Sequence, residues 1–214
     1  MDKFTDQLTD IMTATRQASI NHPFIQALSR GTLPLSIFRY YLIQDNHYLT
    51  AFNHLHRLAA QNLPKNEAII LIHLGEGEDA AQQQIHQEIG LTQKELQNTS
   101  IAPASYAYIT HMYYQLGQYG TAVGCAGLLP CYWLYSEVGL RLAKKKSPVA
   151  LYQEFFDSYA GQDFTTSTKQ MKQIVNQQAA ISDNLTRQRM KRAFVISCHY
   201  ERAFWQMAYT REQW

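Results

Sequence analysis

The sequence predicts an all-α protein, a single-domain bundle of about nine helices. Apolar residues recur at helical spacing along most of the 214 residues, and no segment alternates with a period of two over a useful length. Only ten Gly and six Pro interrupt the chain, and the prolines fall mostly where helices are expected to begin. A chain of this length can bury one full hydrophobic core, so we expect a single domain over residues 1–214.

Proline and glycine residues mark where the expected helices begin and end. The first stops before Asn21-His22-Pro23, and the second ends at Arg30 with Gly31 as its C-cap. Proline then stands near the start of several later helices, a position that tolerates its missing N–H. The nine helices are expected over about 4–20, 23–30, 34–62, 64–89, 103–120, 121–146, 148–160, 163–180 and 183–212.

Composition and charge narrow the classes of function. The net charge of +2 gives no indication of a nucleic-acid partner, and the basic runs 141–146 and 187–192 are short enough to be solvated helix faces. Three cysteines without a Cys-x-x-Cys pair argue against a disulfide framework and a structural zinc site. The amino terminus lacks the plan of a signal peptide, and the apolar run 121–135 is too short to cross a membrane. We expect a cytoplasmic protein with no membrane partner.

Cys131 directly follows Pro130 inside an apolar helical stretch. A proline in a helix interior removes a backbone hydrogen bond, kinks the helix and costs roughly 3 kcal/mol. The surrounding segment from Leu96 to Ser136 contains no charged residue, which is typical of an interior or a subunit interface. Cys131 is either a nucleophile or a small core residue, and the residues around it leave both readings open.

Two carboxylates occupy positions where a core residue is expected. Asp45 lies three residues after Leu42 and four before Leu49, within an apolar stripe. Glu201 has the same relation to Cys198 and Trp205. A buried carboxylate is expensive unless it is paired or its pKa is shifted, so these residues either hold helices together or perform acid–base chemistry.

The eight histidines do not form a di-metal pattern. Di-metal helical bundles carry Glu-x-x-His pairs on two helices, and no histidine here has an acidic residue three or four positions before it. We therefore expect no metal site, and His22 before Pro23 has an ordinary helix-capping explanation.

Several motifs in this order and spacing resemble the TenA family, also called thiaminase II, in its cysteine-bearing branch. They are His22-Pro23-Phe24, Gln44-Asp45-x-x-Tyr48-Leu49, Tyr108-Ile109-Thr110-His111-Met112, Pro130-Cys131-Tyr132-Trp133-Leu134-Tyr135 and Tyr200-Glu201-Arg202-Ala203-Phe204-Trp205. The resemblance covers nearly the whole chain. It implies a haem-oxygenase-like helical fold, a homotetramer, and no metal or organic cofactor.

The resemblance also implies a function and a set of roles. The reaction would convert aminomethyl-pyrimidine, and thiamin, to hydroxymethyl-pyrimidine. Cys131 would be the nucleophile, Glu201 the acid–base residue and Asp45 the ligand of the pyrimidine nitrogens. The residues that would line and orient the ring are Tyr48, Tyr108, Tyr135 and Tyr159.

Two features depart from the family pattern. Tyr159 is followed by Ala-Gly-Gln rather than Gly-Gly and an aromatic residue, and Glu201 is flanked by His199 and Arg202, which we expect to lie off its face. A non-catalytic pyrimidine-binding or regulatory protein on the same scaffold remains an alternative. The sequence does not decide between thiamin and the aminomethyl compound, nor which ring carbon is attacked.

Overall fold

The computed structural model describes residues 3–214, with the side chains of 77–84 and 88 left out. Every regular element within this range is helical, so the all-α prediction is confirmed. The elements are η1 (Phe4–Leu8), α1 (Thr9–Ile20), α2 (Pro23–Arg30), α3 (Leu35–Ala60), α4 (Lys65–Glu88), α5 (Gln93–Asn98), α6 (Pro103–Tyr119), α7 (Thr121–Leu142), η2 (Ala143–Lys145), α8 (Ala150–Ala160), α9 (Gln162–Ala180) and α10 (Asn184–Thr210).

The predicted helices match nine of these, with differences in three places. The helix expected over 121–146 ends at Leu142 and is followed by the 3-10 turn η2. The first predicted helix begins as the 3-10 turn η1, whose Thr5 exchanges two hydrogen bonds with Asn176 of α9 and so ties the turn to another helix. The short α5 was not predicted. Its N-terminus is a capping box in which Thr92 and Glu95 satisfy each other's backbone N–H groups.

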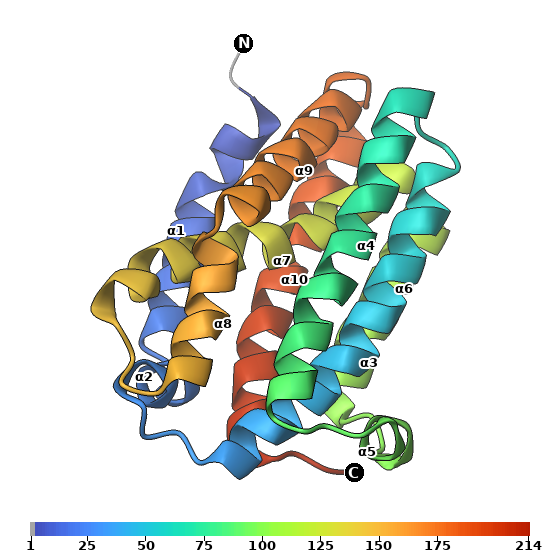
Figure 1. Cartoon of the computed structure of the whole chain (residues 1–214). Helices are drawn as coiled ribbons and strands as arrows, with labels where there is room; N and C mark the ends of the chain where they lie inside the picture. The colour runs from blue at the N-terminus through green and yellow to red at the C-terminus, as the bar shows by residue number, and fades with distance from the viewer. Residues whose placement is uncertain (1–2) are drawn as a thin grey trace.

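Helix α7 occupies the centre of the bundle. It contacts α1, α3, α6, α8, α9 and α10 and runs obliquely through the middle of the molecule in Figure 1. Nearly all of its residues after Ala122 are buried, which explains why its sequence is apolar all round rather than on one face. Pro130 lies inside it and does not end it, so Cys131 remains within this buried helix.

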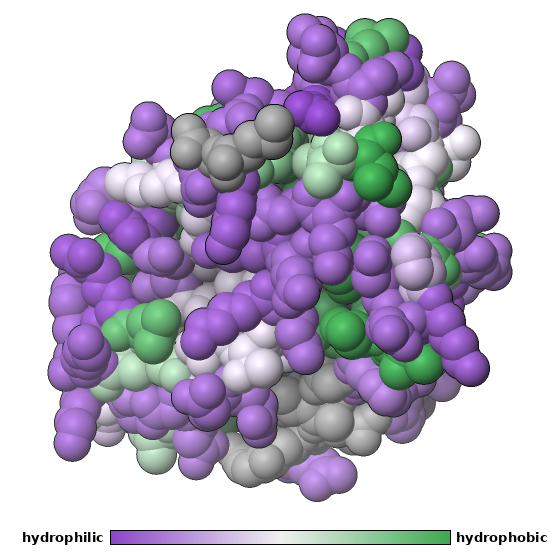
Figure 2. Space-filling model, turned by 90° about the horizontal axis from the view of Figure 1, so that it is seen from above, coloured by the Kyte–Doolittle hydropathy of each residue, from purple (hydrophilic) through white to green (hydrophobic). Residues whose placement is uncertain are grey.

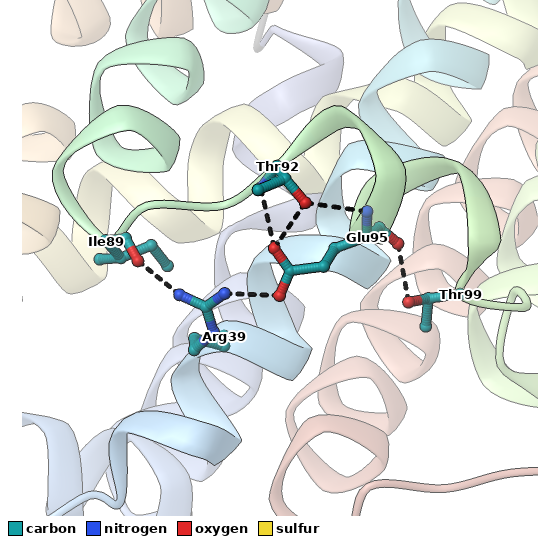
Figure 3. Close-up of polar contacts among 5 residues, drawn as sticks. All are labelled: Arg39, Ile89, Thr92, Glu95 and Thr99. Atoms are coloured by element: carbon teal, nitrogen blue, oxygen red, sulfur yellow. Dashed lines mark hydrogen bonds and ion pairs between the residues drawn. The ribbon is translucent and has the colours of Figure 1, made fainter.

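A polar cluster fastens the connection between α4 and α6 to α3. The guanidinium of Arg39 donates to the carbonyl of Ile89 and to Glu95, 2.6 Å away, which in turn caps α5 through Thr92 (Figure 3). These capping hydrogen bonds, followed by Arg39, lower the pKa of Glu95 to about 2. The charged pair thereby fixes where α5 lies against α3.

Further along α3, Gln44 and His47 hold the segment that leads into α6. Gln44 donates to the carbonyl of Ser100 at 3.0 Å and accepts from the N–H of Ala102 at 2.8 Å. The His47 Nε2 lies 2.8 Å from the carbonyl of Thr99. Because these residues flank Asp45, the same turn of α3 that carries the buried carboxylate also positions the start of α6.

The end of the bundle seen from above is mainly hydrophilic, with separate hydrophobic patches between charged and polar side chains (Figure 2). Among the described residues, no helix combines the length and the apolar character that a membrane crossing requires.

Candidate active site

Four helices bring the predicted site residues together. Helices α3, α6, α7 and α10 all contact one another. Asp45 and Tyr48 lie on α3, and Tyr108 lies on α6. Cys131 and Tyr135 lie on α7, and Glu201 lies on α10. All six side chains are buried. Tyr159 comes from the end of α8 and is half-buried.

Glu201 is the buried acid of this cluster. Only 2% of the residue is exposed, and Tyr108 donates a 2.7 Å hydrogen bond to its Oε1. Burial raises the pKa of Glu201 to about 8, the Tyr108 hydroxyl opposes that rise, and the charge of Asp45 adds to it. The carboxyl therefore carries its proton at neutral pH, with one oxygen occupied by Tyr108.

Asp45 lies close enough to Glu201 for the two carboxyls to interact, as that pKa shift requires. Its own residue is 6% exposed. The flanking residues behave as expected: His199 and Arg202 are exposed and lie off the buried face of Glu201. The two carboxylates thus face inward on α3 and α10, as their places in the apolar stripes predicted.

Cys131 lies among the tyrosines of this cluster. Burial and then the negative charge of a Cys131 thiolate raise the pKa of Tyr48, and the same charge contributes to the raised pKa of Tyr108. Burial raises the pKa of Cys125 and of Cys198 to about 12, and at Cys198 the charge of Glu201 adds to the rise. After burial, the charges of Asp45, Cys131 and Glu201 all raise the pKa of Tyr41, so these three groups surround one buried tyrosine.

The rings of Tyr48 and Tyr108 pack against each other, 5.1 Å apart at an angle of 34°. Their hydroxyls are near enough to shift each other's pKa, but no partner meets hydrogen-bond geometry at the Tyr48 oxygen. The Tyr48 hydroxyl therefore lies close to Cys131 and to Tyr108, whereas the Tyr108 hydroxyl donates to Glu201.

Tyr135 connects the cluster to α8. Its ring lies 4.8 Å from that of Tyr159 and 5.1 Å from that of Trp205. Its hydroxyl is 3.1 Å from the hydroxyl of Tyr41, a fully buried residue that the sequence analysis missed. The signal was available, since Tyr41 lies one helical turn before Asp45 and therefore on the same face of α3.

No group of three or more His, Cys, Asp and Glu side chains within the described part of the chain is arranged to hold a metal ion. His22 caps α2 by accepting from the N–H of Phe24, as its place before Pro23 predicted.

The sequence model of the TENA/THI-4/PQQC family matches residues 10–211. The chain belongs to this family. It is 33% identical to the aminopyrimidine aminohydrolase of Bacillus subtilis (strain 168), in an alignment covering 99% of this chain and 92% of that protein.

Solved structures agree with this assignment. A TenA homologue from P. horikoshii OT3 superposes with a TM-score of 0.88 at 25% identity, over 98% of this chain and 99% of that one. A domain with a haem oxygenase-like fold from Shewanella denitrificans OS217 gives 0.74 at 12% identity, over 99% and 94%. The fold of this TENA/THI-4/PQQC member is therefore haem-oxygenase-like, as expected.

Proposed function

We propose that the protein is an aminopyrimidine aminohydrolase of thiamin metabolism and salvage, which forms a covalent intermediate through Cys131. The observation that carries the proposal is the buried carboxyl of Glu201, protonated at neutral pH and held with Asp45 and Cys131 in one aromatic cluster. A relative at 33% identity named for this activity supports it.

The proposed reaction begins with proton transfer from Glu201 to a ring nitrogen of the aminopyrimidine. The protonated ring is electron-poor, so the Cys131 thiolate adds to a ring carbon. The resulting electron pair expels the leaving group from the exocyclic methylene, as ammonia from the protonated aminomethyl group or as the neutral thiazole. Water then adds to that methylene and releases one proton to the solvent. Departure of the thiolate restores the aromatic ring, the ring proton returns to Glu201, and hydroxymethyl-pyrimidine is the product. The groups that take part in the proposed bond changes are the Cys131 thiol, the Glu201 carboxyl and water.

The surrounding residues have distinct roles in this proposal. Asp45 accepts a hydrogen bond from the exocyclic amino group of the pyrimidine and so favours one ring tautomer. The Tyr48 hydroxyl lies close to Cys131, and the Tyr108 hydroxyl donates to Glu201, so Tyr48 is favoured over Tyr108 as the group that stabilises the Cys131 thiolate. Tyr135 and Tyr159 offer aromatic faces for the planar ring, since both border the same cluster.

Incubation of the purified protein with aminomethyl-pyrimidine, followed by chromatography, tests the activity. We expect hydroxymethyl-pyrimidine and one equivalent of ammonia. Comparison of kcat/KM for this substrate and for thiamin on one preparation then identifies the preferred leaving group. Tight binding of the pyrimidine without any product contradicts the proposal and supports the non-catalytic binding protein instead.

A further inference from the structure

A pocket of about 560 Å³ lies between α6 and α10, outside the cluster around Cys131. One stripe of α10 forms one side of it, through Arg189, Arg192, Ile196 and Tyr200 at intervals of about one turn. A volume of this size is within the range of pockets that hold small molecules.

The pocket is lined by cations and by no carboxylate. Neither Arg189 nor Arg192 forms an ion pair within 4.0 Å with any carboxylate in the described part of the chain. The side chain of Asp183 caps α10 by accepting from the N–H of Thr186, which is the main cause of its lowered pKa. The charge of Arg189 adds a smaller effect to that lowering, without an ion pair. Two unpaired guanidinium groups facing one pocket are suited to an oxyanion, above all a phosphate.

A buried donor points to the same ligand chemistry. His111 of α6 is 9% exposed and lines the pocket, and its Nδ1 lies 3.4 Å from the amide nitrogen of Gln115. When Nδ1 accepts from Gln115, Nε2 carries the hydrogen of the neutral ring, and burial lowers the pKa of His111. A hydrogen bond with the Ala193 backbone opposes that shift, although no acceptor meets strict hydrogen-bond geometry at Nε2.

Aromatic rings supply the rest of the wall. Tyr119 stacks under the guanidinium of Arg189 at 4.8 Å, and Tyr200 lies 5.3 Å from the ring of His111. The ring of Tyr200 also packs against Tyr108, nearly parallel at 15° and 5.3 Å. Tyr108 in turn donates to Glu201. Tyr200 therefore both lines the pocket and contacts a residue of the candidate active site.

We propose that this pocket binds a small phosphate monoester of a planar aromatic ring, at a site separate from that of Cys131. The phosphate contacts Arg189 and Arg192 and accepts from His111, and the ring packs against Tyr119 and Tyr200. The inference does not depend on the proposed reaction, since binding alone defines it.

Calorimetry with phenyl phosphate as the probe tests the site. We expect the full-length protein to bind phenyl phosphate more tightly than inorganic phosphate and not to bind phenol. Arg192→Gln is expected to weaken binding at least about tenfold, because one of two charge-assisted contacts is lost. Lys191→Gln is the matched control: it removes an exposed neighbouring charge that does not line the pocket, and its affinity should stay at the wild-type value.

Circular dichroism and melting temperature, measured for both variants, establish that each is folded. Equal affinity in folded Arg192→Gln and Lys191→Gln proteins overturns the site, as does the absence of binding by wild-type protein at millimolar phenyl phosphate. Equal affinity for phenyl phosphate and inorganic phosphate overturns the assignment of an aromatic ligand.

Discussion

Two neighbours change the pKa of Glu201 in opposite directions. The hydrogen bond from Tyr108 favours the carboxylate and lowers its pKa, while the charge of Asp45 disfavours it and raises the pKa. Burial has the largest effect, and the three together bring the pKa of Glu201 to about 8. If the reaction requires the protonated form, kcat/KM falls as the pH rises past this value.

Substitutions of Tyr108 and of Asp45 should shift the alkaline fall of kcat/KM in opposite directions along the pH scale. Tyr108→Phe removes the hydrogen bond and is expected to shift the alkaline limb of the kcat/KM profile to higher pH. Asp45→Asn removes the repelling charge and should shift it to lower pH, together with a loss of substrate affinity. The measurement is the pH dependence of kcat/KM from pH 6 to 10.

Tyr152→Phe is the matched control for Tyr108→Phe. It removes another buried tyrosine hydroxyl, which donates to the carbonyl of Leu33. Its alkaline limb should coincide with that of the wild type. A Tyr108→Phe limb that also coincides with the wild type contradicts the account of Glu201.

At the residue scale, sequence predicted the inward direction of both carboxylates because helical periodicity places a side chain relative to its own helix. It did not predict which partner each would meet. The bond of Tyr108 to Glu201 joins residues 93 positions apart, and the pairing of Tyr41 with Tyr135 joins residues 94 apart. With fourteen tyrosines in the chain, only packing between helices selects these pairs.

At the scale of elements, a close approach of two helices positions Tyr159. A Cβ on Gly139 of α7 would lie 2.8 Å from the backbone carbonyl carbon of Tyr159 at the end of α8. The backbone cannot move aside as a flexible side chain can. Gly139 therefore allows α8 to hold Tyr159 against Tyr135.

Gly139→Ala should destabilise the protein by about 1–3 kcal/mol, since the extra methyl group overpacks this contact. It should also raise KM by displacing Tyr159. Gly127→Ala is the matched control in the same helix: its Cβ would meet its nearest neighbours at 3.7 and 3.9 Å, an ordinary contact. There we expect unchanged or slightly increased stability in urea unfolding, because alanine has the higher helix propensity. Equal stabilities of the two variants contradict this interpretation.

Sequence predicted the long helices well and the short elements poorly. Proline and glycine signals placed the ends of α2, α4 and α6 correctly. Helix α5 has only six residues, too few for an apolar period, although its Thr-x-x-Glu capping box was visible in the sequence. The pocket between α6 and α10 was not predictable, since part of the basic run 187–192 there looked like a solvated face.

At the scale of the whole molecule, the buried carboxyl of Glu201 makes the stability of the fold depend on pH. The folded-state pKa of Glu201, about 8, lies above its ordinary value of 4.5, so the folded protein holds this proton more firmly than the unfolded chain. The stability due to this group is complete below about pH 4.5 and is lost progressively as the pH rises through 8.

Glu201→Gln should therefore become more stable than the wild type as the pH rises, because glutamine keeps the shape without ionising. The difference in melting temperature should grow between pH 5 and pH 8 and then level off, while activity is lost. Glu76→Gln, at an exposed carboxylate paired with Arg57 at 3.6 Å, is the control and should follow the wild type at every pH. A constant offset between Glu201→Gln and wild type would show that Glu201 is not a buried acid.

The homotetramer expected from the family resemblance remains a prediction about the whole assembly. Light scattering on the purified protein should give four times the chain mass of 24.7 kDa. A monomer contradicts it.

The most direct test of the central claim is turnover of aminomethyl-pyrimidine by Cys131→Ser and Cys125→Ser, measured side by side. Both cysteines lie on α7, both are buried, and both substitutions exchange sulfur for oxygen. We predict that Cys131→Ser loses at least about a thousandfold in kcat, as expected when a nucleophile is removed, while Cys125→Ser keeps its activity in folded protein. Full activity in a folded Cys131→Ser variant, or equal losses in the two, would contradict the assignment of Cys131 as the nucleophile.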